Sequence, residues 1–428
     1  MEPPASVPAV IDGSVTPGFE PVRDEFARNF ERGELGAACA AFHRGEKVVD
    51  LWGGVRDART GAPWEEGTVV LVYSTSKGLA AMTLALAHSR GWLDYDERVA
   101  ALWPDFAQHG KGSVTVRQLL AHEAGLPVID EPLDPDKLAD FDALGAAIAR
   151  QRPLWEPGTR HGYHGVSLGW YEGELLRRVD PDGRTLGRFL AEEIAAPLEL
   201  DFHIGLPPDF PRERLARIER VSRLRALREV RNAPPRMALA LMNPRSVSFR
   251  AFANPRLRSV ADLDRREYRG LEFPAGGGIG TARSIARAYA AFAGDGRELG
   301  LSPETLAELR APARRPPRGW RDEVLRVDTA FSLGFVKPGG EFRFGSSHTA
   351  FGHPGAGGSF GFADPDREVA FAYTPNRLGF HLTDDPREKA LRDALYRCLD
   401  AVPTSAGGVP SPAGATGDPQ PGGDPARL

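Results

Sequence analysis

Ser74 and Lys77 are the two residues whose types and spacing most clearly allow chemistry. They lie between an apolar run that ends at Val72 and a segment, residues 78–87, that is apolar on nearly every face. This pattern predicts a strand or loop leading into a buried helix. Residues three apart share one face of a helix, so the Ser74 hydroxyl and the Lys77 amine can meet. Burial lowers the pKa of a lysine, which would let Lys77 accept the proton of a nucleophilic Ser74.

A second interpretation of the same residues is structural. Ser74, Thr75 and Ser76 are all favoured N-cap residues, and a helix cap needs no catalytic role. The Ser-x-x-Lys pattern is also short enough to recur by chance. The context favours catalysis, because the chain has only 6 lysines among 54 basic residues and one of them opens an apolar helix.

A loop that contains proline and glycine, residues 155–164, carries the next candidate, Tyr163. Loops before a helix often present functional side chains, and the Tyr163 hydroxyl could relay protons between the serine and a leaving group. The alternative is a packed tyrosine with a satisfied hydroxyl. His161 and His164 in this loop have the spacing of a metal pair, but no further Cys or His lies at ligand spacing. We therefore expect no metal and no cofactor.

A glycine-dense stretch, residues 351–361, is the third candidate. Glycines let a strand approach a substrate closely, so that its N–H groups can bind an oxyanion, and a bulged turn is the alternative. The stretch also contains Gly-x-Ser-x-Gly around Ser359, followed by Asp364 or Asp366 and then His381, in the order of an α/β-hydrolase triad. That fold needs strand, turn and helix here, whereas the sequence predicts a strand and then a turn. We therefore expect Ser359 not to be the nucleophile.

The elements that must position these stretches fall into strands at both ends of the chain and helices between them. Strand-like runs, including a hairpin signal around residues 44–46, occupy residues 37–42, 47–52, 67–71, 329–336, 341–344, 359–363 and 368–373. Helical patterns occupy residues 21–32, 115–120, 136–150, 166–179, 185–195, 283–293 and 386–399. The glycine cluster at residues 276–280 is interpreted as a tight loop.

Residues 207–270 are rich in arginine and proline. Within them an apolar residue recurs at every third position from Leu215 to Val230, which predicts a curved surface helix with an arginine-rich outer face. This face is interpreted as solvated or as a lid over a pocket, with nucleic-acid binding as the alternative. Residues 1–18 and 401–428 lack periodicity and are predicted to be disordered.

Length and charge exclude several classes of protein. The 428 residues include 54 basic and 58 acidic side chains, for a net charge of −4, so we expect neither nucleic acid nor a membrane as partner. The only cysteines, Cys39 and Cys398, do not indicate a disulfide framework or a thiolate metal site. The first ten residues lack the features of a signal peptide, and the longest apolar run is too short to span a bilayer. We therefore expect a cytoplasmic protein.

Three motifs in order resemble those of the class C β-lactamase-like serine hydrolases, especially their family VIII carboxylesterase branch. They are Ser74-Thr75-Ser76-Lys77, Tyr163 in its loop, and His353-Pro354-Gly355, and residues 116–126 are also similar to that superfamily. The resemblance covers residues 19 to about 400. It implies an α/β (α+β) fold, with a β-lactamase/transpeptidase-like antiparallel sheet flanked by helices and an inserted helical domain. The sheet subdomain is expected at residues 19–72 and 271–400, and the helical subdomain with a lid at 73–270.

The same resemblance implies roles for individual residues. Ser74 would be the acylated nucleophile, and Lys77 and Tyr163 would form the general base and acid network. The backbone N–H groups of Ser74 and Ala356 would form the oxyanion hole. The substrate would be bound by His353, Gly355, Ala356 and Gly357.

Two departures from the family pattern point away from lactams. Penicillin-binding relatives carry Tyr-x-Asn where this chain has Tyr163-His164-Gly165, and His353 replaces a lysine that would anchor a carboxylate. Histidine is mostly neutral at pH 7. We therefore expect a carboxylesterase that cleaves small to medium acyl esters through an acyl-enzyme on Ser74. The alternatives are an acyltransferase of the same fold, a β-lactamase or D-peptidase-type amidohydrolase, and a catalytically silent binding relative.

Overall fold

The computed structural model describes residues 10–401 apart from 220, 223, 224, 226 and 227. Within them, nine strands form one sheet in the order β1-β3-β2-β12-β11-β10-β9-β8, with β4 paired to β3. The strands are β1 (Ile11–Val15), β2 (Gly36–His43), β3 (Glu46–Asp57), β4 (Ala62–Pro63), β8 (Phe331–Ser332), β9 (Phe335–Val336), β10 (Phe351–Pro354), β11 (Phe360–Asp364) and β12 (Val369–Pro375). The predicted hairpin of β2 and β3 is present.

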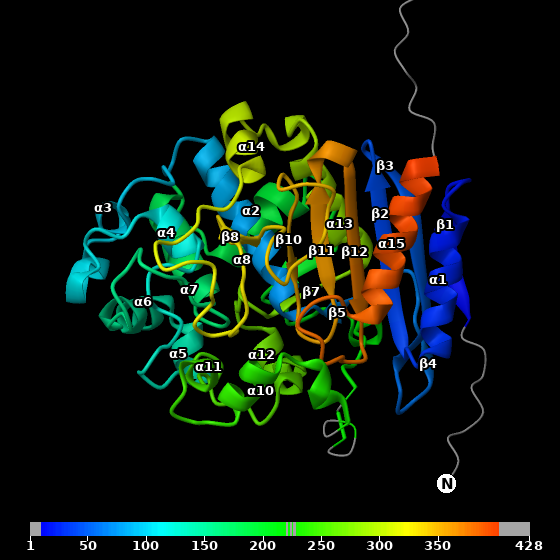
Figure 1. Cartoon of the computed structure of the whole chain (residues 1–428), viewed down its shortest axis with the longest axis horizontal. Helices are drawn as coiled ribbons and strands as arrows, with labels where there is room; N and C mark the ends of the chain where they lie inside the picture. The colour runs from blue at the N-terminus through cyan, green and yellow to red at the C-terminus, as the bar shows by residue number, and fades with distance from the viewer. Residues whose placement is uncertain (1–9, 220, 223–224, 226–227, 402–428) are drawn as a thin grey trace, which may run out of the picture.

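The two ends of the chain meet inside this sheet. β2 pairs antiparallel with β12, from His43 opposite Val369 to Ala37 opposite Pro375. The early, blue strands and the late, orange strands therefore stand side by side in Figure 1. The middle of the chain is inserted between two parts of one sheet, which is the predicted fold class and is confirmed.

Side-chain size decides which helix covers each face of the sheet, because alternate residues of a strand point to opposite faces. Phe371 lies in the same core as residues of α1 and α15, whereas Ala370 lies in the core that includes α13. Small residues let α13 approach closely, since a Cβ atom at Gly361 would lie 2.6 Å from Cγ2 of Ile285. Figure 1 shows α1 and α15 together at the sheet. These helices are α1 (Glu20–Glu31), α13 (Ala282–Ala293) and α15 (Pro386–Ala401).

The inserted segment is mainly helical and is organised around α2 (Ser76–Ser89), whose residues from Ser76 to Ala87 are all buried. α2 packs against α7, α8 and α14 and also against strands β9 and β10. The other helices are α3 (Val99–Leu102), α4 (Val116–Leu120), α5 (Pro135–Ala139), α6 (Phe141–Arg150), α7 (Leu168–Val179), α8 (Leu186–Leu190), α10 (Pro235–Leu241), α11 (Val247–Arg250), α12 (Arg266–Arg269) and α14 (Pro303–Arg310). A small sheet, β5 (Val70–Leu71), β7 (Gly278–Gly280) and β6 (Phe202–Ile204), stands in the order β5-β7-β6.

The predicted disorder of residues 1–18 is wrong for residues 10–18. Ile11 to Val15 form strand β1, which pairs with β3 at the edge of the sheet. The pairing depends on backbone contact that composition does not reveal, because a Cβ atom at Gly13 would lie 2.0 Å from the Asp50 carbonyl oxygen. Residues 1–9 and 402–428 lie outside the described residues, and Ala401 is the last residue of α15.

Other predicted elements are corrected by tertiary pairing. The glycine cluster is not only a loop, since Gly278–Gly280 form β7 between β5 and β6. The predicted helix from Leu215 is wrong at its start, where the Ala216 N–H donates to the Val69 carbonyl and the chain runs extended beside β5. Leu224 and Leu227 lie outside the described residues. Residues 341–344 form no strand, and the 136–150 helix divides at Asp140, which caps α6.

Candidate active site

Ser74 lies in a tight turn at the entrance to α2. The preceding residue, Tyr73, has a φ of 49°, a left-handed conformation that is unfavourable for a residue with a side chain. The alternative capping role does not apply, because none of the three hydroxyls caps the helix. Thr75 Oγ1 contacts Ser359 Oγ at 3.0 Å, Ser76 Oγ accepts from the Gly278 N–H at 2.9 Å, and Ser74 Oγ contacts Lys77. The neighbouring hydroxyls therefore hold the turn from both sides while Ser74 remains available.

Lys77 is fully buried in the first turn of α2. Its Nζ donates to the backbone carbonyls of Gly165 and Ala275, each at 2.7 Å, and lies 3.2 Å from Ser74 Oγ. Burial lowers the pKa of Lys77 from 10.5 to about 7, and the charge of Glu172 opposes this. A neutral amine has two N–H groups and one lone pair. When both N–H groups donate to these carbonyls, the lone pair of Nζ points toward the Ser74 hydroxyl.

Glu172, on α7, is a residue of this site that the sequence reasoning missed. Its side chain is fully buried, and neither carboxylate oxygen has a hydrogen-bond partner among the described residues. Burial raises the pKa of Glu172 to about 8, and the charge of Lys77 opposes the shift. Glu172 therefore stays largely protonated at neutral pH, the range in which Lys77 can be the neutral amine. Sequence offers only one signal, a glutamate on the apolar face of a helix.

Tyr163 is brought to the same place by the loop before α7. Lys77 Nζ lies 4.9 Å from the centre of the buried Tyr163 ring. Burial raises the pKa of Tyr163 above its ordinary value, and the neighbouring Ser74 side chain opposes the rise. The loop is held by Asp322, which accepts the Tyr163 N–H at 2.8 Å and also those of Val324 and Leu325. Asp322 is a second residue that sequence reasoning missed.

Two histidines near Tyr163 form a hydrogen-bonded pair. The pair is His122 with His164, not His161 with His164. His164 Nε2 accepts the Leu126 N–H at 3.1 Å, so its proton is on Nδ1, which faces His122 Nδ1 at 3.1 Å. His161 bonds instead to Thr329 Oγ1 and the Trp320 carbonyl. Burial lowers the pKa of His164 to about 3. Across the described ranges, no group of three or more His, Cys, Asp or Glu side chains is placed to hold a metal ion.

The turn between β10 and β11 brings the glycine-dense stretch against the Ser74 turn. A Cβ atom at Gly355 would lie 2.3 Å from the Val72 carbonyl oxygen and 2.8 Å from Thr75 Oγ1, so only glycine permits this approach. Ala356, at the tip of the turn, is exposed, whereas Gly357 is buried. Ala356 and the predicted substrate-binding residues thus lie on a segment that packs directly against the residues flanking Ser74.

His353, on β10, is buried beside Tyr163, with the two rings 5.9 Å apart. Its Nδ1 lies 2.7 Å from the Pro354 carbonyl, which can only accept, so the proton of the imidazole is on Nδ1. Burial is the main cause that lowers the pKa of His353, to about 3, and the charge of Lys77 adds to it. His353 Nε2 is therefore a lone-pair acceptor, and it is buried without a partner among the described residues.

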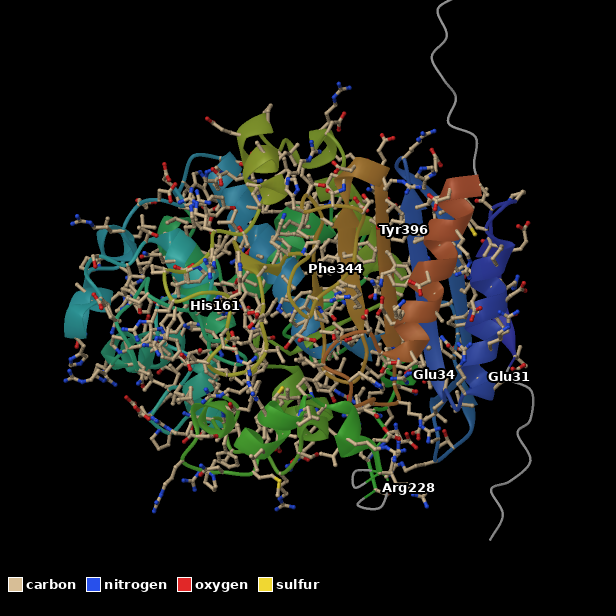
Figure 2. The ribbon with its side chains drawn as sticks, viewed as in Figure 1. Glu31, Glu34, His161, Arg228, Phe344 and Tyr396 are labelled. Carbon is tan, nitrogen blue, oxygen red and sulfur yellow. The ribbon has the colours of Figure 1, made fainter. Side chains whose placement is uncertain are left out.

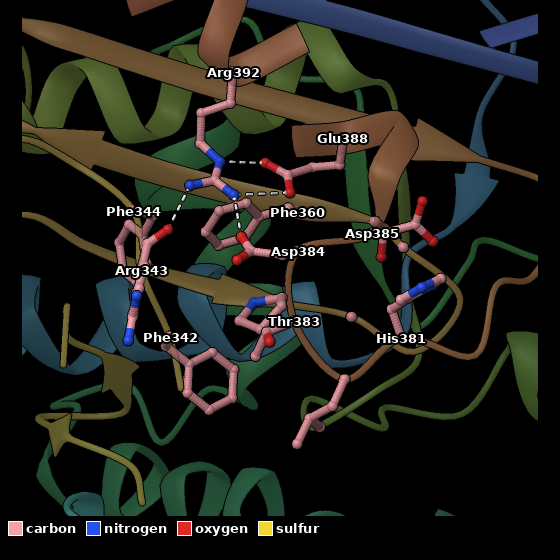
Figure 3. Close-up of a pocket in the computed structure, with 15 residues that line it drawn as sticks. Phe342, Arg343, Phe344, Phe360, His381, Thr383, Asp384, Asp385, Glu388 and Arg392 are labelled. Atoms are coloured by element: carbon pink, nitrogen blue, oxygen red, sulfur yellow. Dashed lines mark hydrogen bonds and ion pairs between the residues drawn. The ribbon is translucent and has the colours of Figure 1, made fainter. Parts of the chain in front are cut away.

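The strand and turn predicted after Ser359 are present. The buried Ser359 hydroxyl donates to the Val72 carbonyl at 2.8 Å, and β11 begins at the next residue. Figure 3 shows the pocket that Ser359 shares with His381, where Arg392 holds Glu388 and Asp384 by ion pairs. No hydrogen bond joins Ser359 to His381 among the described side chains.

The sequence profile of the Beta-lactamase family matches residues 21–396. The chain belongs to that family. It is 32% identical to the Mycobacterium tuberculosis protein "Esterase/beta-lactamase LipL" over 368 residues, which cover 86% of this chain and 83% of the relative.

Several solved structures resemble the chain over nearly its whole length. A family VIII carboxylesterase is 38% identical with a TM-score of 0.79, covering 91% of this chain and 100% of the other. EstA from Arthrobacter nitroguajacolicus Rue61a is 31% identical with a TM-score of 0.77, covering 90% and 98%. A penicillin-binding protein homologue from Caulobacter crescentus is 37% identical with a TM-score of 0.77, covering 91% and 100%. These relatives support a carboxylesterase-like serine hydrolase of the β-lactamase fold.

Two further predictions concern the protein as a whole. Cys39 and Cys398 are both buried free thiols. None of the helices in the described part of the chain has the length and apolar character needed to cross a bilayer.

Proposed function

We propose that the protein is a carboxylesterase that cleaves small to medium acyl esters through an acyl-enzyme on Ser74. The observation that carries the proposal is the geometry at Lys77, whose two amine N–H groups are held by the Gly165 and Ala275 carbonyls while Nζ faces Ser74 Oγ at 3.2 Å. A pKa of about 7 supplies the neutral amine near physiological pH. A lysine held in this way is oriented as a general base toward one hydroxyl.

The reaction would proceed in two steps. Lys77 takes the Ser74 proton as Oγ attacks the ester carbonyl carbon, and the N–H groups of Ser74 and Ala356 bind the oxyanion. Tyr163, which stays protonated because burial raises its pKa, passes a proton from this network to the departing alcohol oxygen. Water then attacks the acyl-enzyme carbonyl, gives its proton to the same network and releases the acid, which restores the Ser74 hydroxyl.

His353 favours esters over β-lactams or peptides as substrates. Those substrates carry a carboxylate that a cationic side chain would anchor, whereas His353 is neutral and offers a lone pair at Nε2. Two acceptors repel one another, so a carboxylate near His353 is disfavoured. At the position of the family's asparagine, Gly165 offers no amide side chain, and the Phe252 ring fills the space where its Cβ would be. A neutral ester meets neither obstacle.

The experiment is active-site labelling followed by an ester screen. A fluorophosphonate probe should attach to the peptide that contains Ser74, since only an activated serine reacts. p-Nitrophenyl esters of graded chain length, with nitrocefin alongside, should show ester cleavage well above lactam cleavage. Ser74→Ala should lose labelling and activity, and Ser359→Ala, the matched control serine, should keep most of both.

Other outcomes of this experiment would overturn the proposal. An adduct on Ser359 would refute the mechanism, and an absence of labelling would indicate a silent binding relative. Nitrocefin cleavage above ester cleavage would indicate an amidohydrolase. Acyl transfer to added alcohols at the expense of hydrolysis would indicate an acyltransferase.

A further inference from the structure

Residues 230–261 carry a charge unlike that of the rest of the chain. They contain six arginines and no aspartate, glutamate or lysine, whereas the whole chain has a net charge of −4. Arg250 pairs with Asp130, but no ion pair joins the other five arginines to an acidic group among the described residues. These five, all exposed, are Arg231, Arg236, Arg245, Arg256 and Arg258. The segment is therefore a concentrated and largely unneutralised positive surface.

The same segment carries nearly all of the exposed large apolar side chains in the described ranges. Of seven such residues, only Val10 lies elsewhere. Met242 is 80% exposed and Leu239 is 71% exposed, and the others are Val230, Phe249, Phe252 and Val260. Helix α10 is made mostly of apolar residues, yet none of them is buried. Apolar side chains gathered on one surface in this way mark a binding face rather than ordinary solvent exposure.

The segment is fixed to the protein by its other residues. Ser248, which is buried, donates its hydroxyl to the Val324 carbonyl, and the Asn254 side chain donates to the Ile129 and Glu131 carbonyls. α10 and α11 contact each other, and Figure 1 shows α10, α11 and α12 together along one edge of the molecule. Figure 2 labels Arg228, another exposed arginine, at the same edge. The polar anchors hold α11 and leave Leu239 and Met242 outside.

We propose that this surface, the α10–α11 face, binds the interface between water and an anionic lipid membrane. Arginines gain energy near negatively charged head groups, while leucine, methionine and phenylalanine side chains gain by entering the acyl boundary. A purely aqueous role would leave the apolar side chains without a partner, and a nucleic-acid role would leave them unexplained. The net charge of the whole chain does not reveal this positive face, because acidic residues in other segments outweigh its arginines.

The α10–α11 face is continuous with the candidate active site through Phe252. The Phe252 ring centre lies 6.4 Å from that of Tyr163, and Phe252 Cε1 would lie 2.3 Å from a Cβ atom at Gly165. Phe252 is also partly exposed. An ester drawn from the lipid surface would thus pass an aromatic side chain before it reached Tyr163. This delivery rests on the proposed function, whereas the binding of the face to lipid does not.

The test is sedimentation of the full chain with phosphatidylcholine vesicles, with and without phosphatidylglycerol. We expect binding to the anionic vesicles that weakens as salt is added. Arg236→Gln with Arg245→Gln should weaken it about fivefold per arginine, and Leu239→Ser with Met242→Ser at least about tenfold. The matched controls, Arg59→Gln and Val10→Ser, should bind as the wild type does. Ser74→Ala should bind normally, which separates binding from the failure of the proposed catalysis.

Four results would overturn the inference. They are no binding to anionic vesicles, equal binding with and without phosphatidylglycerol, self-association that Leu239→Ser abolishes in the absence of lipid, and binding to duplex RNA that does not depend on Leu239. The variants at Leu239 and Met242 should melt at the wild-type temperature, because neither side chain is buried. They should also cleave a water-soluble short ester at the wild-type rate. A loss of that rate would assign these residues to the acyl pocket instead of to the lipid surface.

Discussion

Replacement of Lys77 by methionine should remove the pH dependence that this one residue gives to folding stability. The pKa of Lys77 is about 7 in the folded protein, and its ordinary value of 10.5 applies to the unfolded chain. Between these values the unfolded chain binds more protons than the folded chain, so the free energy of unfolding rises with pH. The slope is about 1.4 kcal/mol per pH unit. Below about pH 7 both states are protonated and the whole cost of burying the ammonium is present.

The wild type should therefore gain about 2.7 kcal/mol over Lys77→Met between about pH 7.5 and 9.5, from the slope above acting over two units. Methionine keeps an unbranched side chain of similar length in the buried site. It leaves the Gly165 and Ala275 carbonyls without their donor, but that cost does not change with pH and cancels in the comparison. Urea unfolding of both proteins across this range measures the difference.

Activity should follow the same titration. kcat/KM of the wild type should rise about tenfold per pH unit below about pH 7 and then level off, as the neutral amine becomes the main form. Lys77→Met should lower kcat by about 10² to 10⁴. Parallel stability curves for the two proteins would refute the reasoning, because they would show that folding does not depress the pKa of Lys77.

The remaining predictions concern the groups around Lys77. Glu172→Gln should leave the acid limb of kcat/KM near its wild-type pH, since Glu172 is already protonated and uncharged below about pH 7; an acid limb that moves to lower pH would show that Glu172 is charged there. Tyr163→Phe should lower kcat by about 10² to 10⁴ with little change in Tm, and near-wild-type turnover would exclude Tyr163 from proton transfer. Asp322→Asn should lower kcat and cost about 1–3 kcal/mol of stability, because an amide NH₂ would face the Tyr163 N–H; urea unfolding and turnover together check this. Prolonged EDTA should leave activity unchanged, and loss restored by zinc would show a metal requirement.

Short-range patterns were enough to predict the contact of Ser74 with Lys77 and the helix that follows Ser74. A three-residue spacing and an unbroken apolar run both act within one turn of helix, so they can be recognised along the chain. Tyr163 and the β10–β11 turn were predicted from loop and glycine composition together with the family resemblance. Their roles at the site remain predictions, while the β-lactamase fold and the family are shown.

Glu172, His122 and Asp322 were not predicted, because nothing in their immediate sequence distinguishes them. Glu172 reaches the site when α7 packs against α2, and Asp322 reaches the Tyr163 N–H across 159 residues of chain. His122 differs from a packed histidine only in the partner it meets, His164. Strand β1 was missed for the same reason, since its backbone partner is β3.

The sequence by itself therefore determined the pairing of Ser74 with Lys77, the buried helix α2 and the arrangement of strands toward both ends of the chain with helices between them. Local spacing and side-chain type govern those features. The tertiary structure alone decided the protonation states of Lys77 and Glu172, the tautomer of His353, and the gathering of exposed apolar and arginine side chains on the α10–α11 face. A pKa depends on burial and on charges from other elements, and exposure depends on what packs against a side chain. Both are set only when distant segments of the chain come together.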